Sequence, residues 1–141
     1  MIRKSNVDDI EEILAIWLEA SIKAHDFIDP EFWRTQVDNM RDIYVPASET
    51  YVYVNNAIIF GFYSLADEML AAIFVSPAHQ GQGIGKALLS HAKTQRRQLR
   101  LSVYKENVAS YGFYLSQGFV LVSEQTDEHT GHLEYTMATR S

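Results

Sequence analysis

An apolar run followed by closely spaced glycines is the feature that most limits the folds open to this chain. The run, Met69 to Val75, contains no polar residue, and glycines follow at positions 81, 83 and 85. Apolar residues then recur at helical spacing from Gly83 to about Arg97, after which Leu99 to Val103 has the pattern of a strand. Strand, helix and strand in this order form a crossover unit, so we expect the two strands to run parallel in one sheet. The unbroken apolar run predicts a first strand that is covered on both faces.

Strand and helix patterns also alternate through the rest of the chain. The apolar stripe after Asn6 has helical spacing, and Pro30 follows Asp29 as a first helical residue follows its cap. Asn55 and Asn56 suit the tight turn of a hairpin. The expected strands are 1–4, 51–54, 57–65, 69–75, 99–103, 119–124 and 133–138, and the expected helices are about 7–18, 30–42, 83–97 and 107–117. These patterns predict a single α/β domain, residues 1–141, built on a mixed sheet.

Length and composition agree with one globular domain. A chain of 141 residues, 47% of them hydrophobic, is long enough to bury a core of its own. No apolar stretch approaches the roughly 18 residues of a membrane span, and Arg3 and Lys4 are not followed by the apolar segment of a secretory signal. The lack of cysteine fits a reducing compartment, and the net charge of −6 disfavours binding to nucleic acid. We therefore expect a cytoplasmic protein whose partners are neither membrane nor nucleic acid.

The glycine-rich turn has the chemistry of a phosphate-binding loop. Glycine allows close approach of the main chain to a ligand, and the free amides at a helix start attract an anion such as a pyrophosphate. Two familiar phosphate loops do not match. Only three residues separate Gly81 from Gly85 and Ala87 follows Lys86, which departs from the mononucleotide P-loop. Lys86 or Leu88 stands where the dinucleotide fingerprint needs a small residue, so a nucleotide-dependent phosphotransferase is the weaker alternative.

The pattern Gln80-x-x-Gly83-x-Gly85, five residues after Val75, resembles the acyl-CoA loop of the GNAT superfamily of N-acetyltransferases. A second segment strengthens the resemblance, because Asn107 precedes a helix that contains Phe113-Tyr114-Leu115-Ser116-Gln117-Gly118-Phe119, similar to the second CoA-side motif of that family. The resemblance implies about seven strands with four helices on both faces. It also implies transfer of an acetyl group from acetyl-CoA to a primary amine, on a small molecule or on a protein lysine or N-terminus, through a ternary complex.

The resemblance further implies where acetyl-CoA binds. In GNAT folds the strands that correspond to 69–75 and 99–103 part, and pantetheine fills the gap like an added strand. A main-chain amide of the first strand then lies near the thioester carbonyl, where it can stabilise an oxyanion. The implied cofactor-binding residues are Ile73, Phe74, Val75, Gln80, Gly81, Gln82, Gly83, Ile84, Gly85, Lys86, Asn107 and Tyr114.

Acyl transfer to an amine needs a proton donor for the thiolate and a base for the ammonium. By family position Tyr114 is the donor, and a phenol with an ordinary pKa of about 10 is protonated at neutral pH. Relatives often place a glutamate on the third strand, where this chain has Met69, with Glu68 one residue away. Unless a bulge corrects that offset, Glu68 is a turn carboxylate. His25 and Asp26, in the loop where GNAT acceptors usually enter, are the alternative base or acceptor contacts.

The remaining polar and aromatic clusters indicate no separate chemistry. His129 and His132 lie in a loop of unfixed spacing, and we expect no metal site. Arg96, Arg97 and Arg100 are interpreted as a solvated helix end, and Trp17 and Trp33 as core or as the wall of an acceptor pocket. A non-catalytic acyl-CoA-binding or protein-interaction module on the same fold is the main alternative function. The identity of the amine stays open, as does the choice between monomer and homodimer.

Overall fold

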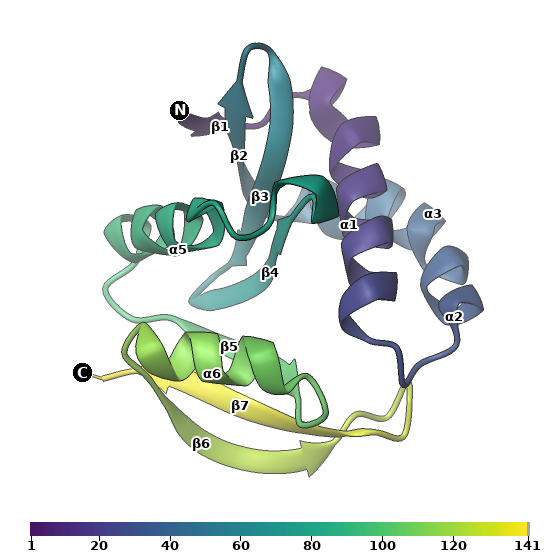
Figure 1. Ribbon diagram of the computed structural model, residues 1–141, viewed down its shortest axis with the longest axis vertical. Coiled ribbons are helices and arrows are strands. Elements are labelled where there is room, and N and C mark those ends of the chain that lie inside the picture. The colour runs from purple at the N-terminus through teal and green to yellow at the C-terminus, as the bar shows by residue number, and fades with distance from the viewer. Residues whose placement is uncertain (141) are drawn as a thin grey trace.

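The computed structural model describes residues 1–140, and in it one twisted seven-stranded sheet runs through the molecule (Figure 1). The strand order is β1-β2-β3-β4-β5-β7-β6, and all neighbours pair antiparallel except β4 and β5. The strands are β1 (Ile2–Lys4), β2 (Glu49–Asn55), β3 (Ile58–Ala66), β4 (Met69–Val75), β5 (Arg100–Tyr104), β6 (Phe119–Thr126) and β7 (Leu133–Thr139). The predicted mixed sheet of seven strands is confirmed.

Three of the four predicted helical segments are regular helices. They are α1 (Ile10–Ala24), preceded by the short turn η1 (Val7–Asp9), then α5 (Ile84–Gln95) and α6 (Val108–Ser116). Asn6 caps η1 and Asn107 caps α6 through their side chains, as expected for these residue types. A short turn, η3 (Pro77–His79), leads from β4 toward α5. Within residues 1–140, no helix is both long enough and apolar enough to span a bilayer.

The predicted helix at 30–42 is broken instead into short pieces that extend to residue 47. These are α2 (Pro30–Thr35), α3 (Val37–Asn39), the π-helical η2 (Met40–Tyr44) and α4 (Val45–Ala47). Asp29 caps α2 as expected, by accepting a hydrogen bond from the Glu31 amide at 2.9 Å. Trp33 is the one buried residue of the segment. Because protein helices are stabilised mainly by a packed apolar face, a segment with one buried anchor has little to keep it straight.

Helices cover the sheet on both faces, and each face has its own apolar core. Along β3, Phe62 and Tyr63 are both fully buried but belong to opposite cores, as alternation in a strand requires. Leu88 and Leu89 of α5 pack in the core that contains Tyr63, together with residues of α6. Trp17 of α1 and Trp33 of α2 pack in the core that contains Phe62. The fold therefore has α1 and α2 on one face and α5 and α6 on the other.

The sheet is continuous everywhere except between β4 and β5. These parallel strands meet in register only where Met69 lies opposite Arg100, and they part beyond that pair. A register shift in the β3–β4 pairing leaves Ala71 as an extra residue on β4, a bulge that bends the strand. Ile73 and Val75 pack against the core under α5, and Phe74 packs against the core under α1, so both faces of β4 are covered as predicted, although the three residues are only half-buried. Their exposure follows from the gap, because no strand lies beside them on that edge.

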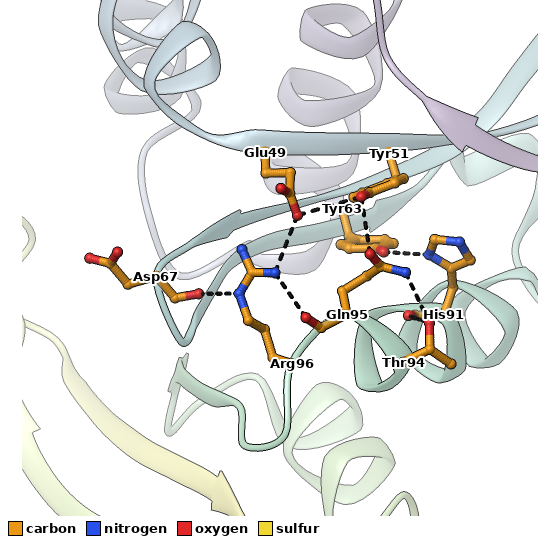
Figure 2. A network of polar contacts seen from close by, with 8 residues as sticks. All are labelled: Glu49, Tyr51, Tyr63, Asp67, His91, Thr94, Gln95 and Arg96. Carbon is orange, nitrogen blue, oxygen red and sulfur yellow. Dashed lines mark hydrogen bonds and ion pairs between the residues drawn. The ribbon is translucent and has the colours of Figure 1, made fainter.

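A polar network attaches the far end of α5 to the sheet (Figure 2). The Arg96 guanidinium donates hydrogen bonds to the Asp67 carbonyl at 2.8 Å and the Glu49 carboxylate at 3.3 Å. His91 Nδ1 lies within hydrogen-bond distance of the Tyr63 hydroxyl, and Tyr63 stacks on Tyr51 with ring centroids 5.1 Å apart. The network holds α5 by its C-terminal end, which leaves its N-terminal end beside the gap between β4 and β5.

Candidate active site

The gap between β4 and β5 opens into a cleft of about 900 Å³. Its walls come from the parted strands, the C-terminal end of α1, the loop from 79 to 86, and α6. Of the twelve residues predicted to bind the cofactor, all except Gln82 line this cleft. The structure thus brings residues from 73 to 114 in the sequence to one concave surface.

The glycine loop forms one end of the cleft and has an open main chain. Gly81 and Gly83 have φ values of 80° and 81°, a region that favours glycine, and Gly83 is the N-terminal cap of α5. No heavy atom lies within 4 Å of where a side chain would begin at either glycine. The helix start and the Lys86 side chain both favour negative charge, so this end of the cleft suits a diphosphate.

Lys23 is a cleft residue that the sequence did not indicate. It lies on the last turn of α1, and its Nζ donates a hydrogen bond to Gln80 Oε1 at 3.1 Å. Gln80 in turn donates from its Nε2 to the Val75 carbonyl at 3.2 Å. A contact between residues 57 positions apart leaves no local pattern in a sequence. The pair places an ammonium group beside the glycine loop.

Tyr114 reaches the cleft from α6 and is buried. Burial raises the pKa of its phenol above the ordinary value of 10, so the hydroxyl keeps its proton at neutral pH. Its ring packs against Phe113 and Phe119, with centroids 5.6 Å and 5.7 Å away. Tyr114 is therefore a neutral, firmly packed hydroxyl on the cleft surface.

His25 lies on the opposite side of the cleft, at the C-terminal cap of α1. Its ring stacks on Trp33 with centroids 5.0 Å apart, and burial lowers the pKa of the imidazole below 6.5. Asn107 Oδ1 accepts a hydrogen bond from the Ser110 amide, which turns Asn107 Nδ2 toward His25 Nε2 at 3.4 Å. Because Asn107 donates, the Nε2 atom presents its lone pair and the ring hydrogen lies on Nδ1. His25 is thus neutral near pH 7, with a basic nitrogen beside Asn107.

The structure does not bring Glu68 to the cleft. Glu68 is exposed in the turn between β3 and β4, where its carbonyl accepts a hydrogen bond from the Arg100 amide at 2.9 Å. The bulge on β4 falls at Ala71, after the turn, so it leaves Glu68 outside. Asp26 is also exposed and is not among the residues that line the cleft.

The remaining histidine, arginine and tryptophan residues singled out in the sequence contact neighbouring side chains or main-chain groups. His132 hydrogen-bonds Glu106 at 3.1 Å, and no three metal-binding side chains converge within residues 1–140. Arg96 takes part in the network at the C-terminal end of α5, away from the glycine loop at its start. Trp17 and Trp33 meet edge to face at 5.9 Å and line the cleft, which agrees with the interpretation of these residues as a pocket wall.

A family model described as an acetyltransferase (GNAT) domain matches residues 15–140. The chain belongs to the GNAT family. The match spans the end of α1, the glycine loop and Tyr114, which are the parts that form the cleft. The chain is therefore an acyltransferase, and the resemblance read from the two motifs is confirmed.

Two Escherichia coli proteins are similar to this GNAT domain over most of their length. The peptidyl-lysine N-acetyltransferase YiaC is 35% identical over 123 residues, which cover 86% of this chain and 84% of YiaC. The peptidyl-lysine N-acetyltransferase YjaB is 30% identical over 131 residues, which cover 92% of this chain and 88% of YjaB. The similarity is thus to whole relatives of about the same size.

Solved structures confirm the GNAT fold. The solution structure of apo-form YjaB from Escherichia coli has a TM-score of 0.86 at 28% identity, covering 98% of this chain and 95% of that one. The PaiA N-acetyltransferase from Thermoplasma acidophilum, solved in complex with coenzyme A, has a TM-score of 0.83 at 19% identity. That comparison covers 100% of this chain and 98% of PaiA. The predicted fold class, with helices on both faces of a seven-stranded sheet, is confirmed.

Proposed function

We propose that this GNAT domain transfers an acetyl group from acetyl-CoA to the ε-amine of lysine side chains in proteins. The observation that carries the proposal is the cleft between β4 and β5, where a neutral tyrosine and a neutral histidine lie on facing walls. The names of YiaC and YjaB support lysine as the acceptor. A small-molecule amine or a protein N-terminus is the alternative class of acceptor.

The cleft is suited to hold acetyl-CoA, which supplies the acetyl thioester. The main-chain groups of Ile73 and the Val75 amide, on the free edge of β4, are available to pair with pantetheine as a neighbouring strand does, whereas the Val75 carbonyl already accepts from Gln80. At the end of the cleft, the amides from Gly81 to Gly85 are placed to bind the diphosphate. Lys86 and Lys23 add positive charge there. These residues bind and orient the donor.

His25 and Tyr114 are assigned the two proton transfers. A lysine ammonium has a pKa of about 10 and must lose a proton before its nitrogen can attack. His25 is neutral, and the Nε2 lone pair faces Asn107 Nδ2 at 3.4 Å, so Nε2 accepts that proton, directly or through water, once Asn107 moves aside. The Tyr114 hydroxyl donates a proton to the departing sulfur, and burial keeps it protonated for that role.

The proposal is tested with an N-acetylated peptide that contains one lysine, acetyl-CoA and mass spectrometry of the product. We expect one acetyl group on the lysine and none on a matched peptide with glutamine in its place. Tyr114→Phe removes the proton donor and keeps the packing, so kcat should fall about 100-fold while the KM for acetyl-CoA changes little. Leu115→Ala, on the exposed side of the same helix, is the control and should keep kcat. Unchanged turnover in Tyr114→Phe would contradict the assigned role, and no lysine acetylation would contradict the acceptor.

A further inference from the structure

The negative charge of the chain is concentrated on the side of the molecule where α2 to α4 meet the β6–β7 loop. Segments 25–47 and 127–134 contain eight Asp and Glu residues and two Arg residues, a formal net charge of −6. The whole chain has 18 acidic and 12 basic residues, also a net charge of −6. The rest of the chain is therefore neutral overall. We call these two segments together the acidic face.

The two segments of the acidic face adjoin in space. Phe27 meets His132 edge to face with centroids 5.2 Å apart, and Asp127 lines one cavity together with Phe32 and Tyr44. In Figure 1, the β6–β7 loop rises toward the loop that joins α1 to α2. The two segments of the acidic face thus lie side by side, next to the cleft.

A second cavity, of about 230 Å³, opens within the acidic face. Its volume is below the roughly 300 Å³ at which small-molecule sites begin, so it suits a single side chain. The cavity shares Trp17, Trp33 and Tyr104 with the cleft, so the two hollows adjoin. Its other walls are Phe32, Gln36, Met40, Tyr44, Asp127 and His129.

The lining of the second cavity matches a side chain with an apolar stem and a positive charge. Aromatic faces attract cations, and lysine and arginine bury their methylene stems along apolar surfaces. Burial opposes ionisation of Asp127, but hydrogen bonds from Tyr104, the His129 amide and Thr130 together lower the pKa of its carboxyl group. Asp127 is therefore a fixed negative charge in the cavity wall.

We propose that the acidic face is a docking surface for a basic segment of a protein substrate, in which cationic residues flank the acceptor lysine. The inference rests on the proposed function, because it assigns the sequence context of the lysine that enters the cleft. A flanking Lys or Arg occupies the second cavity, and the remaining carboxylates attract the segment during encounter.

Three N-acetylated seven-residue peptides test the docking surface. Each has one central lysine flanked two positions away on both sides by Arg, Ser or Glu. We expect kcat/KM to be about tenfold higher for the Arg peptide than for the Glu peptide at low salt, and the difference to shrink at about 0.5 M salt. Equal values for the three peptides, or a ratio that salt does not change, would overturn the docking surface.

A pair of double variants separates the local charge from the net charge. Asp42→Asn with Glu128→Gln neutralises two exposed carboxylates of the acidic face that make no ion pair within residues 1–140. Asp8→Asn with Asp67→Asn neutralises two exposed carboxylates elsewhere. The first pair should reduce the preference for the Arg peptide about threefold, and the second should leave it as in the parent. The same loss in both pairs would overturn the proposal.

Tryptophan fluorescence reports docking without turnover. Both tryptophans of the chain, Trp17 and Trp33, line the second cavity. In the absence of acetyl-CoA, the Arg peptide should shift their emission in a saturable titration, and the Glu peptide should not. If the Arg peptide leaves the tryptophan emission unchanged, the docking surface is overturned even where acetylation proceeds. A normal titration without acetylation supports the docking surface and counts against the proposed function.

Discussion

The two ring nitrogens of His25 have different surroundings, which fixes the tautomer of the ring. Nε2 receives the amide hydrogen of Asn107, and Nδ1 has no hydrogen-bond partner within residues 1–140. Asn107 holds its orientation because its oxygen caps α6. One asparagine thus couples a helix cap to the tautomer of the proposed base.

His25→Gln tests the base through the pH profile. Burial lowers the pKa of His25 below 6.5, so the ring becomes protonated and unable to accept a proton only at pH values below that. We expect kcat/KM for the lysine peptide to fall as pH decreases through this region, with an apparent pKa below 6.5. His25→Gln should lower kcat about 100-fold and remove this acidic limb of the pH profile, so that kcat/KM no longer falls in the same pH region. Glu68→Gln is the control, and a loss of the limb in this variant instead would contradict the assignment.

The same shift links His25 to stability. The folded protein resists protonation of the ring, whereas the unfolded chain takes up a proton near pH 6.5. Acidification from pH 7 to pH 5 should therefore decrease the free energy of unfolding more in the parent than in His25→Gln. Urea unfolding at both pH values measures this difference. Equal decreases in the two proteins would show that His25 is not protected from protonation.

Lys23→Ala tests the contribution of α1 to donor binding. The ammonium lies beside the glycine loop through its contact with Gln80, so its loss should weaken CoA binding about tenfold. Binding of pantetheine, which lacks the diphosphate, should not change. Calorimetry with both ligands measures the two affinities, and Lys4→Ala on the edge strand β1 is the control. An equal loss for both ligands would show that Lys23 acts on folding and not on the diphosphate.

At the scale of elements, α1 bridges the two sides of the cleft. Its last turn contacts the glycine loop through Lys23, and its C-terminal cap contacts the start of α6 through His25. One helix end therefore joins the donor-binding loop to the proposed base. Rotation or loss of that turn would affect both at once.

Arg96→Ala tests the anchor of α5. Arg96 ties the end of the helix to the β3–β4 turn and to Glu49 on β2 (Figure 2). Removal of its hydrogen bonds should lower the free energy of unfolding by about 1–2 kcal/mol, measured by urea denaturation. Affinity for CoA should stay the same, because the glycine loop lies at the other end of α5. Arg97→Ala, next to it in the sequence, should have little effect on either quantity.

Local patterns predicted the elements well where one residue type decides the geometry. Asn6 and Asp29 cap their helices as expected, Asn107 also caps its helix, and Gly83 adopts the left-handed conformation that begins α5. The segment after Thr35 is different, because its course depends on packing against α1 and not on its own periodicity. A π-helical turn and the short helix α4, which contains Pro46, extend the helical segment to residue 47, beyond its predicted end at residue 42.

At the scale of the whole molecule, the site arises from topology. A crossover predicts that β4 and β5 are parallel neighbours, but hydrophobic periodicity cannot say that they separate after one residue pair. The contact between His25 and Asn107, 82 positions apart, is likewise set by the sheet and its two helical layers. The family resemblance predicted the gap and suggested the proposed role of Tyr114, whereas Lys23 and the acidic face were found only in the three-dimensional arrangement.

The gap between β4 and β5, with the glycine loop at its end, is proposed to bind coenzyme A. Isothermal titration of the folded protein with CoA measures this binding. We expect saturable binding of one CoA per chain, with pantetheine bound more weakly because it leaves the loop amides and Lys23 unused. The absence of any CoA binding, in protein whose circular dichroism shows the expected helices and strands, would contradict the proposal.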